Sequence, residues 1–115
     1  MQDAEKFDSG VRHFNGQRFF EAHEIWEELW LAAAEPEKTY LQGLIQIAAA
    51  FHHFKRDNPR GAQSLLAAGA AKLESCPETF RGISIPSLRC DLGPWRVFLR
   101  DCCAGAPELP RLRHA

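Results

Sequence analysis

One short stretch of the sequence, residues 19–30, carries most of the groups that could do chemistry: a histidine, several glutamates and four aromatic residues. His23 and Glu27 stand four positions apart within it. If the stretch is helical, side chains at this spacing project from the same side of the helix. An imidazole and a carboxylate placed together can exchange a proton with a substrate or bind a metal ion. The stretch therefore predicts a polar site, and the elements packed against it decide its chemistry.

The metal interpretation of this stretch needs a third ligand. The run His23-Glu24-x-x-Glu27 resembles the zinc-protease pattern His-Glu-x-x-His only superficially, because Glu27 replaces the second histidine. The candidates for a third ligand are His52 and His53. Two antiparallel helices could bring His23, Glu27 and His53 together, so these three are the candidate ligands of a divalent metal or the groups of an acid/base catalyst. The sequence itself requires no cofactor.

The same residues have a structural interpretation, which the sequence favours. Buried polar groups must find hydrogen-bond partners, and networks of such groups fix how helices pack. We therefore expect His23 and Glu27 to point inward and to contact each other, or Gln46 or His53 on the next helix. The candidate members of this polar cluster are His23, Glu24, Glu27, Trp30, Gln46 and His53.

The composition describes a single ordinary globular domain. The chain has 115 residues, of which 45% are hydrophobic and 25% charged, and a domain of this size buries enough surface to fold without disulfides or metal. A formal net charge of −1 provides no basic field for nucleic acid. The N-terminus lacks the apolar core of a secretory signal, and the uncharged run 39–54 is too short and too polar to span a bilayer. These features predict a cytoplasmic protein that binds neither nucleic acid nor membrane.

Hydrophobic periodicity predicts an all-α fold, a compact single-domain array or bundle of about five helices. The expected helices cover residues 3–15, 19–34, 37–56, 59–76 and a last segment from about residue 86. The run 80–86 has the composition of an ordered, extended connection, and Gly93-Pro94 is expected to kink or split the last helix. We assign residues 1–104 to the domain and residues 105–115 to a flexible C-terminal tail.

The third of these helices is expected to be the central and most buried element. Its apolar residues cover most of the helical wheel and leave a narrow uncharged stripe that includes Gln42, Gln46 and His53. A solvated stripe normally recruits lysine or glutamate, so this one indicates an interior or an interface. Asn58 is placed to cap the next helix, and Pro59 suits its first position. Small residues on the buried side of that helix predict close helix contact.

The cysteines show neither the Cys-x-x-Cys spacing of a metal site nor a favourable pairing, since two of them are adjacent. We expect free, reduced, buried thiols at all four positions, Cys76, Cys90, Cys102 and Cys103.

Four short motifs follow one another in the first two thirds of the chain. They are His23-Glu24-x-x-Glu27-x-x-Trp30, Gly43-Leu44-Ile45-Gln46, Ala48-Ala49-Ala50 and Asn58-x-x-Gly61-Ala62-x-x-Leu65-Leu66. In this order and spacing they resemble the DUF309 family, small all-helical proteins of prokaryotes and plastids. The resemblance covers about residues 7–73, and the combination is specific although each piece alone is weak.

This resemblance implies a compact helical array and implies no activity. The residues that it places on the family's motif positions are His23, Glu24, Glu27, Trp30, Gln46, Asn58 and Gly61, the last two forming a helix-turn motif. The sequence departs from the family at Asp57, where glycine usually precedes the asparagine.

Three functions remain open from the sequence. The favoured one is a non-enzymatic binding or assembly module with a homo-oligomeric or protein partner, in which the polar cluster is structural. The second is a hydrolase-like enzyme, metal-dependent or acid/base, that uses His23, Glu27 and His53. The third is an adaptor with an exposed apolar groove for a peptide. Nothing in the sequence names a substrate or a partner.

Overall fold

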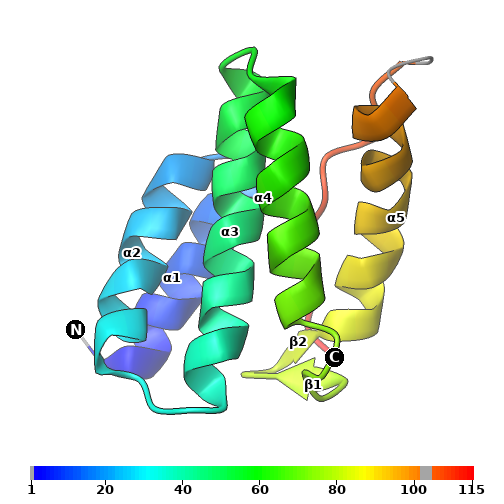
Figure 1. The fold of residues 1–115 in the computed structure, drawn as a ribbon. Coiled ribbons are helices and arrows are strands. Elements are labelled where there is room, and N and C mark those ends of the chain that lie inside the picture. The colour runs from blue at the N-terminus through cyan, green and yellow to red at the C-terminus, as the bar shows by residue number, and fades with distance from the viewer. Residues whose placement is uncertain (1, 102–104) are drawn as a thin grey trace.

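A computed structural model describes residues 2–101 and 105–115 of the chain. Its elements in chain order are α1 (Asp3–Asn15), α2 (Phe19–Ala32), α3 (Glu37–Lys55), α4 (Pro59–Lys72), β1 (Thr79–Phe80), β2 (Ile83–Ser84) and α5 (Ile85–Asp101). The five helices of the described chain stand side by side, with α3 in the middle and the two short strands at one end (Figure 1). The predicted all-α fold is therefore confirmed, and the expected extended connection is a small antiparallel hairpin.

Helix α3 is the centre of the core, as its apolar periphery predicts. It has more buried positions than any other helix, because α2 packs on one side of it and α4 on the other. The buried positions of α3 are Leu41, Gly43, Leu44, Ile45, Ile47, Ala48, Ala50 and Phe51. Even so, none of the helices in the described part of the chain is long and apolar enough to cross a membrane.

Helix α1 holds α2 in place through the indole of Trp26, which is fully buried. The Trp26 ring stacks on Phe7 with centroids 6.0 Å apart, and its Nε1 donates to the Phe7 carbonyl over 3.3 Å. Gly10 makes room for this contact, since a Cβ there would lie 2.1 Å from Trp26 Nε1. The apolar side of α2 is thus turned toward α1 and α3. Phe20 and Leu31, at the edges of the apolar arc, remain 44% and 72% exposed.

Helices α3 and α4 approach closely where glycine faces glycine, as the small residues of α4 predict. A Cβ on Gly69 would lie 2.7 Å from the Gly43 carbonyl oxygen and 2.8 Å from Ile47 Cγ1. These distances are shorter than real Cβ contacts allow, so the backbone spacing here depends on the missing side chain.

Helix α4 begins at Pro59 as expected but ends at Lys72, before the Cys76-Pro77 stop. Helix α5 is one continuous helix and is not split at Gly93-Pro94. Gly93 and Pro94 are exposed, so the carbonyl that loses its hydrogen-bond partner at proline can be solvated.

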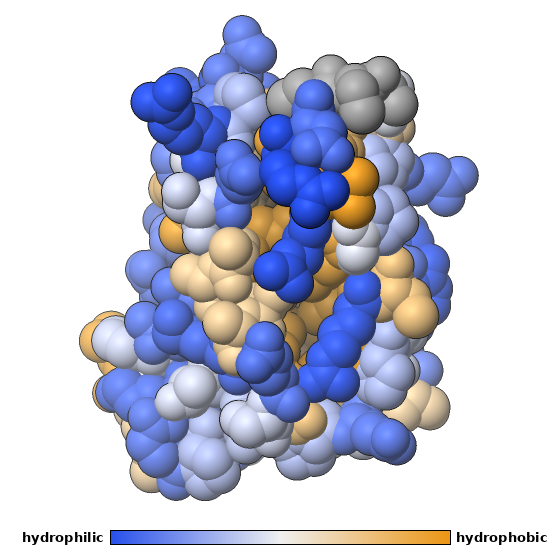
Figure 2. Space-filling model, turned by 45° about the vertical axis from the view of Figure 1, so that its right-hand side comes forward, coloured by the Kyte–Doolittle hydropathy of each residue, from blue (hydrophilic) through white to orange (hydrophobic). Residues whose placement is uncertain are grey.

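Arginine side chains cover the seam between α4 and α5. Figure 2 brings this side forward and shows apolar side chains on the floor of a hollow that strongly hydrophilic ones cross. A hollow of about 250 Å³ at this seam is lined by Leu73, Leu92, Arg89 and Arg96 among others. The Arg89 guanidinium donates to the Leu73 carbonyl, so its stem lies over the apolar floor.

The segment 105–115, which we expected to be a flexible tail, packs against the domain in the structure. Leu112 is 3% exposed, and the Asn15 amide both donates to the Leu112 carbonyl over 2.9 Å and accepts from its N–H over 2.7 Å. Trp95 Nε1 donates to the Glu108 carbonyl over 2.8 Å, and His114 forms a bridge with Ile83. Buried apolar side chains and paired backbone groups give this segment a fixed place despite its prolines.

Two of the four thiols belong to the described residues, and both are free. Cys76 is buried, and desolvation raises the pKa of its thiol, which makes it a poor nucleophile. Cys90 is exposed, so the burial expected for it is wrong: α5 turns that position outward. Cys102 and Cys103 lie outside the described residues.

The glycine contact between α3 and α4 can be tested by adding one methyl group. Gly69→Ala should lower the free energy of unfolding by about 1–3 kcal/mol, because the Cβ overlaps backbone that cannot move aside. Gly93→Ala in α5 is the matched control, since nothing lies within 4 Å of its Cβ position. Chemical denaturation of both variants measures the difference, and equal stabilities would mean that the two helices are not in close contact.

Candidate functional site

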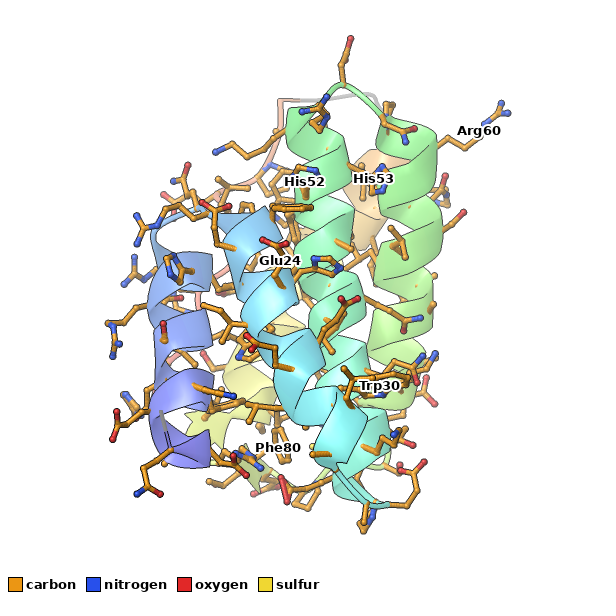
Figure 3. All side chains as sticks on the ribbon, turned by 90° about the vertical axis from the view of Figure 1, so that its left-hand side faces the viewer. Glu24, Trp30, His52, His53, Arg60 and Phe80 are labelled. Atoms are coloured by element: carbon orange, nitrogen blue, oxygen red, sulfur yellow. The ribbon has the colours of Figure 1, made fainter. Side chains whose placement is uncertain are left out.

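A groove runs along the face that α2, α3 and α4 form together. It has two sections that share His23 and Ala49. The larger section, which we call the histidine pocket, has a volume of about 500 Å³ and is lined by Phe20, His23, Ala49, His52, His53, Arg56 and Asn58. The smaller section, the polar slot, has a volume of about 250 Å³ and is lined by His23, Glu27, Trp30, Gln42, Ile45, Gln46, Ala49 and Leu65. Figure 3 looks onto this face, with His52 and His53 toward one end and Trp30 toward the other.

Helical periodicity brings these side chains to one face. On α2, His23, Glu27 and Trp30 follow the i, i+4, i+7 spacing of one helix side. On α3, the uncharged stripe that contains Gln42 and Gln46 faces them. The stripe predicted to lie at an interior or an interface therefore forms one wall of the groove.

His23 and Glu27 are in contact, as the sequence predicts. The distance from His23 Nε2 to Glu27 Oε1 is 3.0 Å. Since a carboxylate only accepts, Nε2 carries a proton, and in the neutral imidazole Nδ1 is left as an acceptor. Glu27 thus selects the tautomer of His23 and leaves Nδ1 as an enclosed acceptor.

The pair is not buried, contrary to our expectation. The His23 side chain is 24% exposed and that of Glu27 is 52% exposed. No polar or charged residue among those that the structure describes falls in the buried class. Glu24 is exposed and lines neither section, so the structure does not bring it together with the rest of the cluster.

Three polar atoms of the slot are closed off from solvent and have no hydrogen-bond partner in the described structure. They are His23 Nδ1, Trp30 Nε1 and Gln46 Oε1. An unpaired buried polar group costs about 1–3 kcal/mol, and most such groups in proteins are paired. The residues of the slot therefore carry one enclosed donor, the indole N–H, and two enclosed acceptors that bond to no other described group of the protein.

A cation contacts the indole ring of Trp30. Lys38 Nζ lies 4.4 Å from the centroid of the Trp30 ring, a cation–π contact. Trp30 packs against the core and lines the slot. Trp30 is thus a fixed wall whose only hydrogen-bonding group remains unused.

The helix-turn motif positions His53 in the histidine pocket. Asn58 caps α4 by accepting from the Gly61 N–H through Oδ1 over 3.2 Å, so its Nδ2 donates to His53 Nδ1 over 2.9 Å. A Cβ on Gly61 would lie 2.6 Å from Asn58 Nδ2, which explains the glycine. Asp57 has φ of 61°, a left-handed conformation that favours glycine but that aspartate tolerates, so the turn survives the departure at this position.

The three-ligand metal set that the sequence left open at His23, Glu27 and His53 does not form among the described residues. No group of three or more His, Cys, Asp or Glu side chains in the described chain could hold a metal ion. His53 Nδ1 is taken by Asn58, and His23 Nε2 is taken by Glu27. The contact predicted from the i, i+4 spacing within α2 is confirmed. His53 on α3, however, turns toward Asn58 at the start of α4 and not toward Glu27.

Sequence reasoning missed two residues of the histidine pocket, Phe20 and Arg56, and considered His52 only as a third metal ligand. The pKa of His52 lies below its usual value, first because of burial and then because of the positive groups Arg56, His53 and His23, while Glu21 acts in the opposite direction. The sequence did contain a signal for this pocket, namely two adjacent histidines followed by an arginine at the end of a predicted helix.

A family model described as a domain of unknown function, DUF309, matches residues 7–65, just over half of the chain. This chain belongs to the DUF309 family. The residues of the groove from Phe20 to Asn58 lie inside the matched segment, and the resemblance seen in the motifs is confirmed.

Two relatives of this DUF309 chain carry no assigned activity. An uncharacterized protein of Aquifex aeolicus (strain VF5) is 35% identical over 92 residues, which are 79% of this chain and 28% of that protein. The uncharacterized protein YpuF of Bacillus subtilis (strain 168) is 44% identical over 50 residues, which are 43% of this chain and 29% of that protein. The matches therefore span less than a third of the length of either relative.

The two roles of Asn58 can be separated by substitution. Asn58→Ala removes the cap of α4 and should lower the free energy of unfolding by about 1 kcal/mol. Asn58→Asp keeps an oxygen for the Gly61 N–H but loses the N–H donor to His53, so it should retain most of the stability. Thermal melts compare the two, and an equal loss in both variants would contradict the cap as the main contribution.

Proposed function

We propose that this DUF309 chain is a non-enzymatic binding module whose polar slot receives a small polar molecule. The observation that carries the proposal is the set of three enclosed atoms without a partner in the described structure, His23 Nδ1, Trp30 Nε1 and Gln46 Oε1, which belong to residues that line one hollow. A structural network would pair such atoms with each other or with the backbone. Polar groups kept unpaired at a cost to stability are a feature of binding sites.

The slot defines the chemistry of its ligand. A molecule that fits must accept one hydrogen bond from Trp30 Nε1 and donate to His23 Nδ1 and to Gln46 Oε1. Ile45 and Leu65 supply apolar walls, which suit a flat group. The volume of about 250 Å³ limits the ligand to a small one. A primary amide has the required acceptor, its carbonyl, and the two required donors, its NH₂ hydrogens, in one plane.

Entry to the slot requires one side chain to move. The three atoms are closed to bulk water, so a ligand must displace part of the rim. Glu27 is the movable part, because its side chain is 52% exposed and its contact in the site is with His23. Its contact with the imidazole keeps Nδ1 unprotonated in the neutral form and so keeps an acceptor available.

Acid/base catalysis at His23 is a second candidate, and the same contact favours it. A carboxylate that holds an imidazole by one nitrogen and leaves the other free toward a cleft is the arrangement of a general base. Glu27→Gln discriminates between the two functions. It preserves a hydrogen bond to Nε2–H and so preserves binding, whereas it should strongly reduce any hydrolysis of p-nitrophenyl acetate above that of free imidazole, because the imidazolium loses its counter-charge.

The stability of the ligand-free protein tests whether the slot is structural. Gln46→Met replaces an unpaired oxygen by an apolar group of similar shape and should raise the free energy of unfolding by about 0.5–1 kcal/mol. Gln63→Met on the exposed side of α4 is the control and should change it little. A loss of about 1 kcal/mol or more in Gln46→Met, measured by chemical denaturation, would show that the amide has a structural partner.

Benzamide is a direct probe of binding. In NMR spectra of ¹⁵N-labelled protein, the indole N–H signal of Trp30 should shift on adding millimolar benzamide, because this donor gains an acceptor. The signals of Trp26 and Trp95 should stay in place, since their indoles already donate to the Phe7 and Glu108 carbonyls.

The Gln46→Met variant controls the benzamide titration, because it removes one of the acceptors that the ligand needs. Its Trp30 signal should shift much less at the same concentration. If the three indole signals of the wild type respond alike, or if none responds, the slot is not a binding site of this chemistry.

A further inference from the structure

The histidine pocket gathers nitrogen donors and no carboxylate. Of the residues that line it, three are histidines, one is an arginine and one an asparagine, and none is acidic. Arg56, at the end of α3, is exposed and forms no ion pair with any carboxylate in the described part of the chain. The pocket therefore has an excess of positive charge and donors on a chain whose formal net charge is −1.

The donors of this pocket are oriented by the fold. The Asn58 amide donates to His53 Nδ1, so the proton of the neutral His53 ring sits on Nε2. His52 is next to it, with ring centroids 6.0 Å apart. Arg56 follows His52 by one helical turn, and this spacing places the guanidinium on the same side of α3 as His52. An N–H of His53, a ring nitrogen of His52 and the guanidinium thus belong to one hollow.

An aromatic wall closes the pocket on the side of α2. The Phe20 ring lies 5.1 Å from the His52 ring and 5.5 Å from the His23 ring, centroid to centroid. Phe20 is nevertheless 44% exposed, which is a high value for an aromatic side chain at the edge of a core. An apolar ring beside nitrogen donors limits the access of water and strengthens their attraction for a charged group.

We propose that the histidine pocket binds an oxyanion group, a phosphate or a carboxylate, at the charged end of a ligand whose neutral polar end occupies the polar slot. That the two groups belong to one ligand rests on the proposed function; the oxyanion section itself does not. The two sections share His23 and Ala49. Because the side chain of Ala49 is short, it does not separate one section from the other. One small molecule can therefore span both.

The electrostatics of His52 agree with this assignment. The pKa of His52 is lowered first by burial and then by Arg56, His53 and His23, with Glu21 on α2 as the opposing charge. An anion among these groups offsets their mutual repulsion and raises the pKa of His52. Binding of an oxyanion should therefore strengthen as pH falls through the range in which this histidine takes up its proton.

Inorganic phosphate is the first probe, titrated at constant ionic strength against chloride. The imidazole signals of His52 and His53 in NMR spectra should shift with saturation, while those of His13 and His114, which lie outside the pocket, should not. Benzoate in a parallel titration tells whether the pocket prefers a carboxylate. A saturable shift at His52 and His53 with either anion supports the inference.

Two arginines provide a matched pair of variants. Arg56→Gln should weaken anion binding about tenfold, since it removes a charge-assisted hydrogen bond. Arg60 is also exposed but lines neither section and points into solvent (Figure 3), so Arg60→Gln should leave binding within about twofold. Melting temperatures of both variants confirm that they are folded.

The inference is overturned if neither anion shifts His52 and His53 more than His13 and His114, or if Arg60→Gln weakens binding as much as Arg56→Gln. Benzamide added to the same samples keeps the two proposals distinct. A shift of the Trp30 indole without any anion response means that the oxyanion section fails and the polar slot stands. An anion response without a Trp30 shift means that the polar slot fails as a binding site and the oxyanion section stands.

Discussion

The structure depends on the burial of α3. This helix has apolar residues over most of its circumference, so it is stable only when other helices cover it on several sides. α2 covers one side, where the Phe19 ring lies 5.5 Å from the Phe51 ring, centroid to centroid, and α4 covers another through the close approach at Gly43 and Gly69. The tight spacing on one side and the bulky aromatic layer on the other leave a strip of α3 that neither neighbour covers. The groove lies on that strip.

The groove is therefore a result of incomplete covering, and its chemistry follows from what α2 and α3 present along the strip. A narrow polar stripe without charges cannot be solvated as well as one with lysine or glutamate, and its amides seek hydrogen-bond partners. At Gln46 that partner is missing within the described structure, as it is at His23 and Trp30. A cluster that we expected to be satisfied internally is instead half-open and incomplete, which is why we interpret it as a binding site.

The two ends of the groove differ in their electrostatics because different parts of the helices form them. The end near the last turn of α3 collects basic side chains, His52, His53 and Arg56, where the negative end of the helix dipole favours them. The other end is formed by mid-helix residues, which are neutral apart from Glu27. A ligand with one charged and one neutral end matches this gradient.

The sequence alone determined the features that depend on local spacing. Helical periodicity predicted the helices, the residues Asn58 and Pro59 predicted the start of α4, and the i, i+4 spacing predicted the contact between His23 and Glu27. The close approach of α4 to α3 was also predicted, because glycine and alanine on the buried side of a helix allow a neighbouring helix to come near. These predictions hold because each depends on residues within one or two turns of each other, or on the apolar content of a single helix.

Only the tertiary structure decided which polar groups meet and which remain unpaired. Whether His53 turns toward Glu27 or toward Asn58 depends on where α4 lies, and the sequence of α3 does not contain that information. The same holds for the exposure of Phe20 and for the docking of residues 105–115 on Asn15, across 97 positions of the chain. Such contacts depend on the relative placement of elements far apart in sequence, which follows from the packing of the whole core and not from any local pattern.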